Sequence, residues 1–116
     1  MKFFILLAAA PGAEPDPGTP EFDEMMNEYF TLDEKMKDVA TVLSGEGLEP
    51  AATSRSVRKR GGKVETMDGP FAETREHLGG FYLIEAKDMD AALTFAAEIP
   101  AARYGTVEVR PVMSYE

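Results

Sequence analysis

One stretch, from Asp68 to Ala86, constrains the fold more than any other part of the chain. It opens on Asp68-Gly69-Pro70-Phe71, in which aspartate favours the first turn position, glycine permits a positive φ and proline fixes its own φ. Gly79-Gly80 then lets the backbone bend or approach another group closely. Phe81 to Ala86 is apolar on both faces apart from Glu85, as is typical of a strand covered on both sides. The stretch therefore predicts a rigid turn, a short polar helical turn, a flexible joint and a central strand.

The beginning of the chain carries a second run that is apolar on both faces, Lys2 to Ala8. This pattern predicts another buried strand. A lysine followed by apolar and small residues is also typical of a signal peptide, but this run is at the short end of the ~7–15 residues of a signal core. We therefore expect a strand. We also expect a cytoplasmic protein, since no run approaches the ~20 apolar residues of a membrane span.

Apolar residues at helical spacing predict two helices. The first begins at Thr19-Pro20-Glu21, which supplies a cap, a proline at the first helical position and an acid, and is expected to stop near Ser44-Gly45. The second is capped by Asp88 and ends at Pro100. Stripes of methionine and aromatic residues are more often core than cofactor-binding surface. The buried faces are expected to carry Phe22, Met25, Met26, Tyr29, Met36, Val39, Ala40 and Leu43 in the first helix, and Met89, Ala92, Leu93, Ala96 and Ala97 in the second.

Three further strands are predicted, over Ala51 to Lys59, Lys63 to Met67 and Thr106 to Met113. The first two are joined by Arg60-Gly61-Gly62-Lys63, because Gly-Gly is a favoured tight hairpin turn. Charge on this hairpin has two interpretations: protection of an exposed sheet edge, or attraction of an anionic ligand or an acidic partner. The basic residues concerned are Arg55, Arg58, Lys59, Arg60 and Lys63.

The predicted order β-α-β-β-β-α-β indicates an α+β domain with a four- to five-strand antiparallel sheet and two helices on one face. Two strands are apolar on both faces, so the second face of the sheet also needs a cover, and no helix is left to supply it. A second copy packed sheet to sheet is the economical cover and predicts a C₂ homodimer. With 116 residues, the chain is expected to form one domain over residues 1–116.

Several separated segments match one family in the right order. They are Asp68-Gly69-Pro70-Phe71, Glu73-Thr74-Arg75-Glu76, Leu78-Gly79-Gly80-Phe81-Tyr82-Leu83-Ile84, Ile99-Pro100, Ala102-Arg103-Tyr104-Gly105 and Val107-Glu108-Val109-Arg110-Pro111-Val112. Together they resemble the DGPF branch of the YCII-related domain family over nearly the whole chain. The resemblance implies a ferredoxin-like unit that pairs into a dimeric α+β barrel. Genes of this branch often lie beside sigma-factor genes, which implies a regulatory or stress-response setting, and the branch has no settled biochemical function.

Some relatives in that family carry a histidine on the first helix and an aspartate that together suggest a catalytic dyad. The predicted first helix of this chain, Phe22 to Leu43, has no histidine. The dyad is therefore not carried over to this chain.

Composition excludes several classes of function. The formal net charge of −9 argues against general nucleic-acid binding and against an anionic membrane surface. The absence of cysteine removes disulfides, a thiolate nucleophile and zinc–thiolate sites. A single histidine rules out a multi-histidine metal site. Carboxylates could still hold Mg²⁺ or Ca²⁺, but no regular ligand spacing is present, so we predict neither a metal nor a cofactor.

A barrel-like dimer leaves a cavity between the sheet face and its loops, where Asp68, His77, Glu108 and Arg110 are expected to meet. His77 is a candidate general base, and Asp68 is a candidate to orient it or to act as the base itself. Arg110 would bind a carboxylate or stabilise an enolate. The predicted site comprises Asp68 and His77 as catalytic residues, with Gly69, Pro70, Phe71, Glu73, Gly79, Gly80, Glu108 and Arg110 as substrate-binding residues.

Each of these residues also has a structural interpretation. Asp68 is typical of a turn-capping carboxylate, and His77 of an exposed histidine at a helix end. Glu108 and Arg110 suit cross-strand charge partners, and Phe71 suits a core anchor.

Two functions stay open on the sequence. The first is a homodimer that binds a small, possibly anionic metabolite at the DGPF motif and has a regulatory role. The second is a small acid–base enzyme of the lyase or isomerase type. A strongly shifted pKa of Asp68 or His77, beside an empty apolar pocket, would favour the enzyme.

Overall fold

The computed structural model describes residues 1–72 and 74–115. The described part of the chain forms six strands and two main helices, with a short 3₁₀ turn before the third strand and a short helix before the last one. Their bounds are β1 Lys2–Ala9, α1 Pro20–Lys35, β2 Ala40–Gly47, η1 Ala51–Thr53, β3 Arg55–Arg60, β4 Lys63–Asp68, β5 His77–Ala86, α2 Met89–Ala97, α3 Ala101–Tyr104 and β6 Thr106–Pro111.

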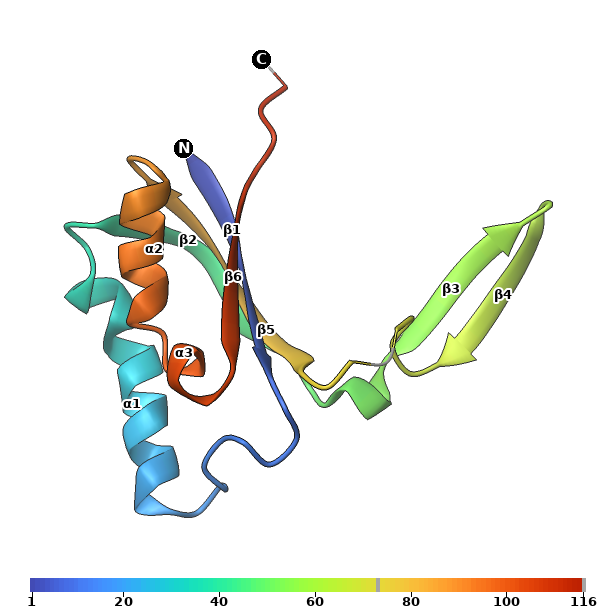
Figure 1. The fold of residues 1–116 in the computed structure, drawn as a ribbon, viewed down its shortest axis with the longest axis horizontal. Coiled ribbons are helices and arrows are strands. Elements are labelled where there is room, and N and C mark those ends of the chain that lie inside the picture. Colours follow the sequence, from blue (N-terminus) through green and yellow to red (C-terminus); the bar gives the residue numbers. More distant parts are fainter. Residues whose placement is uncertain (73, 116) are drawn as a thin grey trace.

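Four strands form one antiparallel sheet in the order β2-β5-β1-β6, so the two runs predicted to be central lie in its middle. Helices α1 and α2 pack on one face of this sheet (Figure 1). Phe3 and Ile5 of β1, Ile84 of β5 and Phe95 of α2 are fully buried between the two layers. The predicted α+β class, with an antiparallel sheet of four strands and two main helices on one face, is confirmed.

The starts of both main helices follow the predicted capping chemistry. The Phe22 N–H donates to Thr19 Oγ1 at 3.2 Å, and Pro20 is the first helical residue. At the start of α2, the Ala91 N–H donates to the Asp88 carboxylate at 2.9 Å. Within residues 1–72 and 74–115, no helix is long and apolar enough to cross a membrane.

The first helix is shorter than predicted, because it ends at Lys35 and the segment Ala40–Gly47 forms strand β2. Met36 is buried as the C-terminal cap of α1, and a turn follows it. The apolar spacing in this region therefore comes from a buried turn followed by a strand, not from a continuing helix. Thr41 and Val42 are β-branched, which favours a strand, and β5 supplies hydrogen-bonding partners for the backbone of β2.

The predicted hairpin forms, but it lies outside the main sheet. Strands β3 and β4 pair only with each other, and β2 takes the edge position beside β5. Gly61 and Gly62 have φ values of +55° and +80°, as the Gly-Gly turn requires. The strand predicted from Ala51 starts at Arg55, because residues 51–53 form a 3₁₀ turn instead.

Smaller differences concern α2 and the strand ends. Phe95 is fully buried and its ring meets Tyr82 edge-on with centroids 5.7 Å apart, whereas Leu93, predicted to be buried, is 49% exposed. The large aromatic ring therefore sets which side of α2 faces the sheet. Strand β5 starts at His77 rather than Phe81, and the described part of the preceding polar segment forms bends, not the predicted helical turn.

The hairpin β3–β4 extends away from the rest of the molecule as an arm (Figure 1). The radius of gyration is 16.2 Å, whereas a compact domain of this length has about 13 Å. Val57 and Val64 of the arm are 67% and 64% exposed, so the arm has no core of its own. An isolated two-stranded hairpin is at best marginally stable in water, so the arm needs a surface to pack against.

The sheet face opposite the helices is apolar along its two central strands. Phe4 and Leu6 of β1 lie opposite Leu83 and Phe81 of β5, and all four side chains are only partly buried. The rings of Phe4 and Phe81 stack with centroids 5.3 Å apart. This open face and the projecting arm both support the proposal that a second copy of the chain covers them.

We expect sedimentation at micromolar concentration to give about twice the 12.7 kDa mass of one chain. Leu83→Glu places a charge on the open sheet face and should shift the protein to monomer while circular dichroism stays native-like. Leu93→Glu, on the outer surface of α2, is the matched control and should leave the dimer intact. A monomeric wild type, or a Leu83→Glu protein that stays fully dimeric, would contradict the proposed interface.

Candidate functional site

Two cavities lie where β1 and β5 separate from the loops and helix α1. The first, which we name the DGPF cavity, is bounded by the open sheet face and by the loops that flank the arm. The second, which we name the helix-side cavity, lies between α1 and the sheet. Their volumes are about 900 Å³ and about 350 Å³, both within the range of known ligand pockets.

The DGPF cavity depends on the turn predicted from the sequence. Gly69 has φ +87°, which only glycine adopts readily. Its N–H donates to Ser54 O at 2.7 Å, and its carbonyl accepts from Ser56 Oγ at 2.8 Å. These bonds hold the two loops together at the base of the arm, and Pro70 and Phe71 then follow along the cavity wall.

The DGPF cavity is rich in hydrogen-bond acceptors. Three carboxylates line it, those of Glu49, Glu76 and Glu108, together with His77. Among the described residues, no lysine or arginine lines this cavity. The loop hydroxyls already donate to backbone carbonyls, so they have only acceptor capacity left for a ligand. These hydroxyls belong to Thr53, Ser54, Ser56 and Thr74.

The structure brings together part of the predicted site. The residues that line the DGPF cavity include Pro70, Phe71, His77 and Glu108. Phe71 is 78% exposed, so it is not the core anchor of the structural interpretation. Gly79 and Gly80 line the helix-side cavity instead. Glu73 lies outside the described residues.

Asp68 and Arg110 are not among the residues that line either cavity, although the ionic partner of Arg110, Glu108, lines the DGPF cavity. The Asp68 carboxylate lies 3.5 Å from Arg55 Nε across the arm and is 89% exposed. Arg110 pairs with Glu108 two residues earlier on β6. The geometry therefore separates Asp68 from the cavity that holds His77, and a catalytic Asp68–His77 pair stays a prediction without support from this arrangement.

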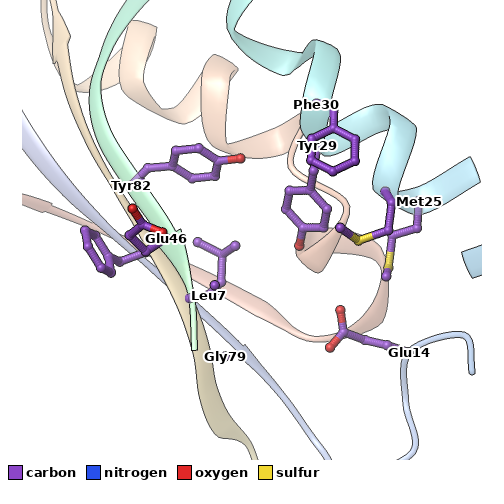
Figure 2. A pocket seen from close by; sticks show the side chains of 13 residues that line it. Leu7, Glu14, Met25, Tyr29, Phe30, Glu46, Gly79 and Tyr82 are labelled. Atoms are coloured by element: carbon purple, nitrogen blue, oxygen red, sulfur yellow. The ribbon is translucent and has the colours of Figure 1, made fainter. Parts of the chain in front are cut away.

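The helix-side cavity gathers aromatic and methionine side chains. Figure 2 shows Tyr29 and Met25 reaching from α1, Tyr82 reaching from β5, and Glu14 approaching from the loop before α1. Four glycines of β2 and β5 line the sheet side of the cavity: Gly45, Gly47, Gly79 and Gly80. The sequence pattern predicted Tyr29 in the core stripe but gave no role to Glu14 or Tyr82. The signal that points to them is that a tyrosine in a core stripe needs a partner for its hydroxyl.

Tyr29 is the residue whose acidity is most perturbed. Burial raises its pKa to about 12, with smaller contributions in the same direction from Glu14 and Tyr82 and opposing ones from the Ala101 backbone and Arg103. The pKa of Tyr82 is also raised, mainly by burial. Both phenols are therefore protonated at neutral pH and can donate hydrogen bonds into the cavity.

No group of three or more His, Cys, Asp or Glu side chains within residues 1–72 and 74–115 is arranged to hold a metal ion.

Comparison with known proteins identifies relatives of this chain. The family model of the YCII-related domain matches residues 1–116. An uncharacterised protein of Rhizobium meliloti is 35% identical over 98 residues, which cover 83% of this chain and 79% of that protein. Among solved structures, 5-chloro-2-hydroxyhydroquinone dehydrochlorinase from Burkholderia phenoliruptrix, in complex with 2,5-dihydroxybenzoquinone, superposes with a TM-score of 0.53. That match has 16% identity and covers 97% of this chain and 94% of the other, so it shows a common fold.

The two adjacent glycines of β5 should differ in their tolerance of a side chain. A Cβ on Gly80 would lie 3.0 Å from Glu46 O and 3.7 Å from Leu7 Cδ2, whereas one on Gly79 would meet no atom within 4 Å. Thermal unfolding should therefore show Gly80→Val destabilised by about 1–3 kcal/mol, as for other overpacked sites, and Gly79→Val by clearly less. Equal melting temperatures for the two variants would contradict this packing.

Absorbance of phenolate on raising the pH should contain a component near pH 12 that disappears in Tyr29→Phe, because burial raises the Tyr29 pKa to about 12. The folded state holds this proton more tightly than the unfolded state, whose tyrosine has the ordinary pKa of 10.0. The contribution of protonated Tyr29 to the free energy of unfolding is thus complete below pH 10 and is lost as the pH rises through 12. An unchanged titration curve in Tyr29→Phe would show that Tyr29 is not the buried phenol.

Proposed function

The chain belongs to the YCII-related domain family, and from that premise we propose that it is a homodimer that binds a small molecule in the DGPF cavity. The main observation in support of this proposal is the DGPF cavity itself. Its walls combine the exposed aromatic ring of Phe71 with His77, and they come from segments that are far apart in the sequence. An apolar cavity with a few convergent polar groups is the usual form of a small-molecule site.

The lining defines the class of ligand. Phe71, Leu78 and Leu48 are exposed apolar side chains along the cavity, which suits an apolar ligand group. The polar groups are mostly acceptors, and three of them are carboxylates, so the ligand should carry hydrogen-bond donors, such as an amine or a hydroxyl. The anionic ligand predicted from Arg110 and the basic arm is not favoured by this lining.

The proposed second copy of the chain would support ligand binding, because it would cover the DGPF cavity. One wall of the DGPF cavity is the open sheet face, including Leu6 and Ala8 of β1, and the proposed interface lies on the same face. A partner packed there would exclude water from the cavity, which strengthens polar contacts with the ligand. The cytoplasmic location and the regulatory role stay predictions.

An acid–base enzyme is the second candidate, and the fold likeness to a dehydrochlorinase favours it. In this alternative, His77 takes a proton from a bound substrate and Glu76 or Glu108, which line the same cavity, stabilises the imidazolium that forms. The candidate base of this chain is on β5, since α1 and the rest of the chain contain no other histidine.

His77 supplies a direct test, because it is the single histidine of the chain and gives one set of imidazole proton resonances in untagged protein. Phenethylamine, which joins an apolar ring to an amine, should shift these resonances in a saturable titration. Phenylacetate, its anionic counterpart, should bind more weakly. Phe71→Ala should weaken phenethylamine binding about fivefold or more through the loss of apolar contact.

Leu93→Ala is the matched control, since Leu93 is an exposed apolar residue outside both cavities. Tighter binding of phenylacetate, or equal binding by Phe71→Ala and wild type, would contradict the proposed site. His77→Gln separates the two functions once a converted substrate is found. It should retain binding in either case, but it should lower turnover by about 10²–10⁴-fold only if His77 is the general base.

A further inference from the structure

Four glycines line the sheet side of the helix-side cavity, and two of them, Gly47 and Gly79, have open space where a side chain would lie. Gly45, Gly47, Gly79 and Gly80 all line it. A Cβ on Gly45 would lie 2.7 Å from Cδ1 of Tyr82, whereas one on Gly47 would meet no atom within 4 Å. The Tyr82 ring thus covers Gly45, and the glycine wall is open backbone at Gly47 and Gly79, where a planar group can lie closely.

Polar groups approach this wall from three separate elements. Tyr29 comes from α1, Tyr82 from β5 and Glu14 from the loop before α1 (Figure 2). Glu14 and Tyr82 are close enough to Tyr29 to contribute to its raised pKa. The Tyr82 hydroxyl makes no hydrogen bond with the described residues and is not sealed from solvent. The cavity thus offers phenol donors on one side and a carboxylate acceptor on another.

Apart from the Glu46 carboxylate on β2, the remaining lining is apolar. Met25, Met26 and Leu7 contribute to it, and thioether sulfurs make favourable contacts with aromatic rings. Phe30 at the rim is 74% exposed, and a bound ring would cover part of it. Among residues 1–72 and 74–115, no lysine or arginine lines the cavity, so nothing there compensates the burial of an anion.

We propose that the helix-side cavity is a second ligand site, which binds a neutral, planar ring that carries a hydroxyl group. The ring lies against the glycine wall. Tyr29 donates a hydrogen bond to the hydroxyl oxygen of the ligand, and the ligand hydroxyl donates to the Glu14 carboxylate. The volume of about 350 Å³ suits a molecule of this size. This site is independent of ligand binding in the DGPF cavity.

The proposal is tested with 4-ethylphenol as the probe, by ligand-observed NMR titration of the full-length protein. The probe should bind saturably. Two analogues should bind at least about fivefold more weakly, 4-ethylanisole because methylation removes the donor and 4-ethylbenzoate because it carries a buried charge. Tyr29→Phe should weaken 4-ethylphenol binding about fivefold through the loss of one hydrogen bond.

A variant that fills the helix-side cavity tests whether 4-ethylphenol binds there. Gly47→Val places its side chain in open space beside the glycine wall, so the protein should keep its melting temperature and lose 4-ethylphenol binding about tenfold or more. Thr41→Val places a valine on the same strand outside both cavities and should bind like wild type. Phe71→Ala, in the DGPF cavity, should also bind the probe like wild type.

Four outcomes overturn the proposal. They are no saturable binding of 4-ethylphenol at millimolar concentration, equal binding of 4-ethylbenzoate, wild-type affinity in a folded Gly47→Val protein, and loss of affinity in Phe71→Ala but not in Gly47→Val. The last result would move the probe to the DGPF cavity.

Discussion

The pairing of β1 with β5 is the constraint on which the rest of the molecule depends. Phe3 lies opposite Ile84 and Ile5 opposite Tyr82, and these side chains form the centre of the core under the helices. Strands β2 and β6 join the sheet only through this pair. Loss of register here would expose the core and also remove a wall from each cavity.

A bulge in the pairing of β1 with β5 divides the residues that line one cavity from those that line the other. Leu7 lies opposite Gly80, but the next residue, Ala8, lies opposite Leu78, so Gly79 is the additional residue of a bulge. Leu7 and Gly80 line the helix-side cavity, whereas Ala8 and Leu78 line the DGPF cavity. The bulge thus lets neighbouring residues of one sheet serve chemically different pockets, one rich in carboxylates and one in phenols.

Local chemistry in the sequence was enough to predict the capped helix starts, the Gly-Gly hairpin and the two central strands. Strand β2 was missed because a buried turn at Met36 followed by a strand imitates helical spacing, and only the pairing with β5 decides between them. That error also concealed the helix-side cavity, since its glycine wall includes Gly45 and Gly47 of the same strand.

Some residues of the predicted functional site lie together at one cavity, and others lie outside it. Pro70, Phe71, His77 and Glu108 meet because the loop after the arm returns beside the open face. Asp68 lies on the arm beside Arg55, and Arg110 is outside the lining but pairs with Glu108. The Arg55–Asp68 pair depends on the register of β3 and β4, which residue spacing alone does not specify.

The position of β1 has a consequence for the synthesis of this protein. It leaves the ribosome well before its partners, β5 and β6, with Lys2 opposite Glu85 and Phe3 opposite Pro111. Protein synthesis adds about 5–20 residues per second, so β1, which is apolar on both faces, stays unpaired for several seconds. The arm, in contrast, pairs neighbouring residues and can form within microseconds of emerging. During this interval β1 is therefore the strand of the domain most exposed to aggregation, and slower translation lengthens the interval.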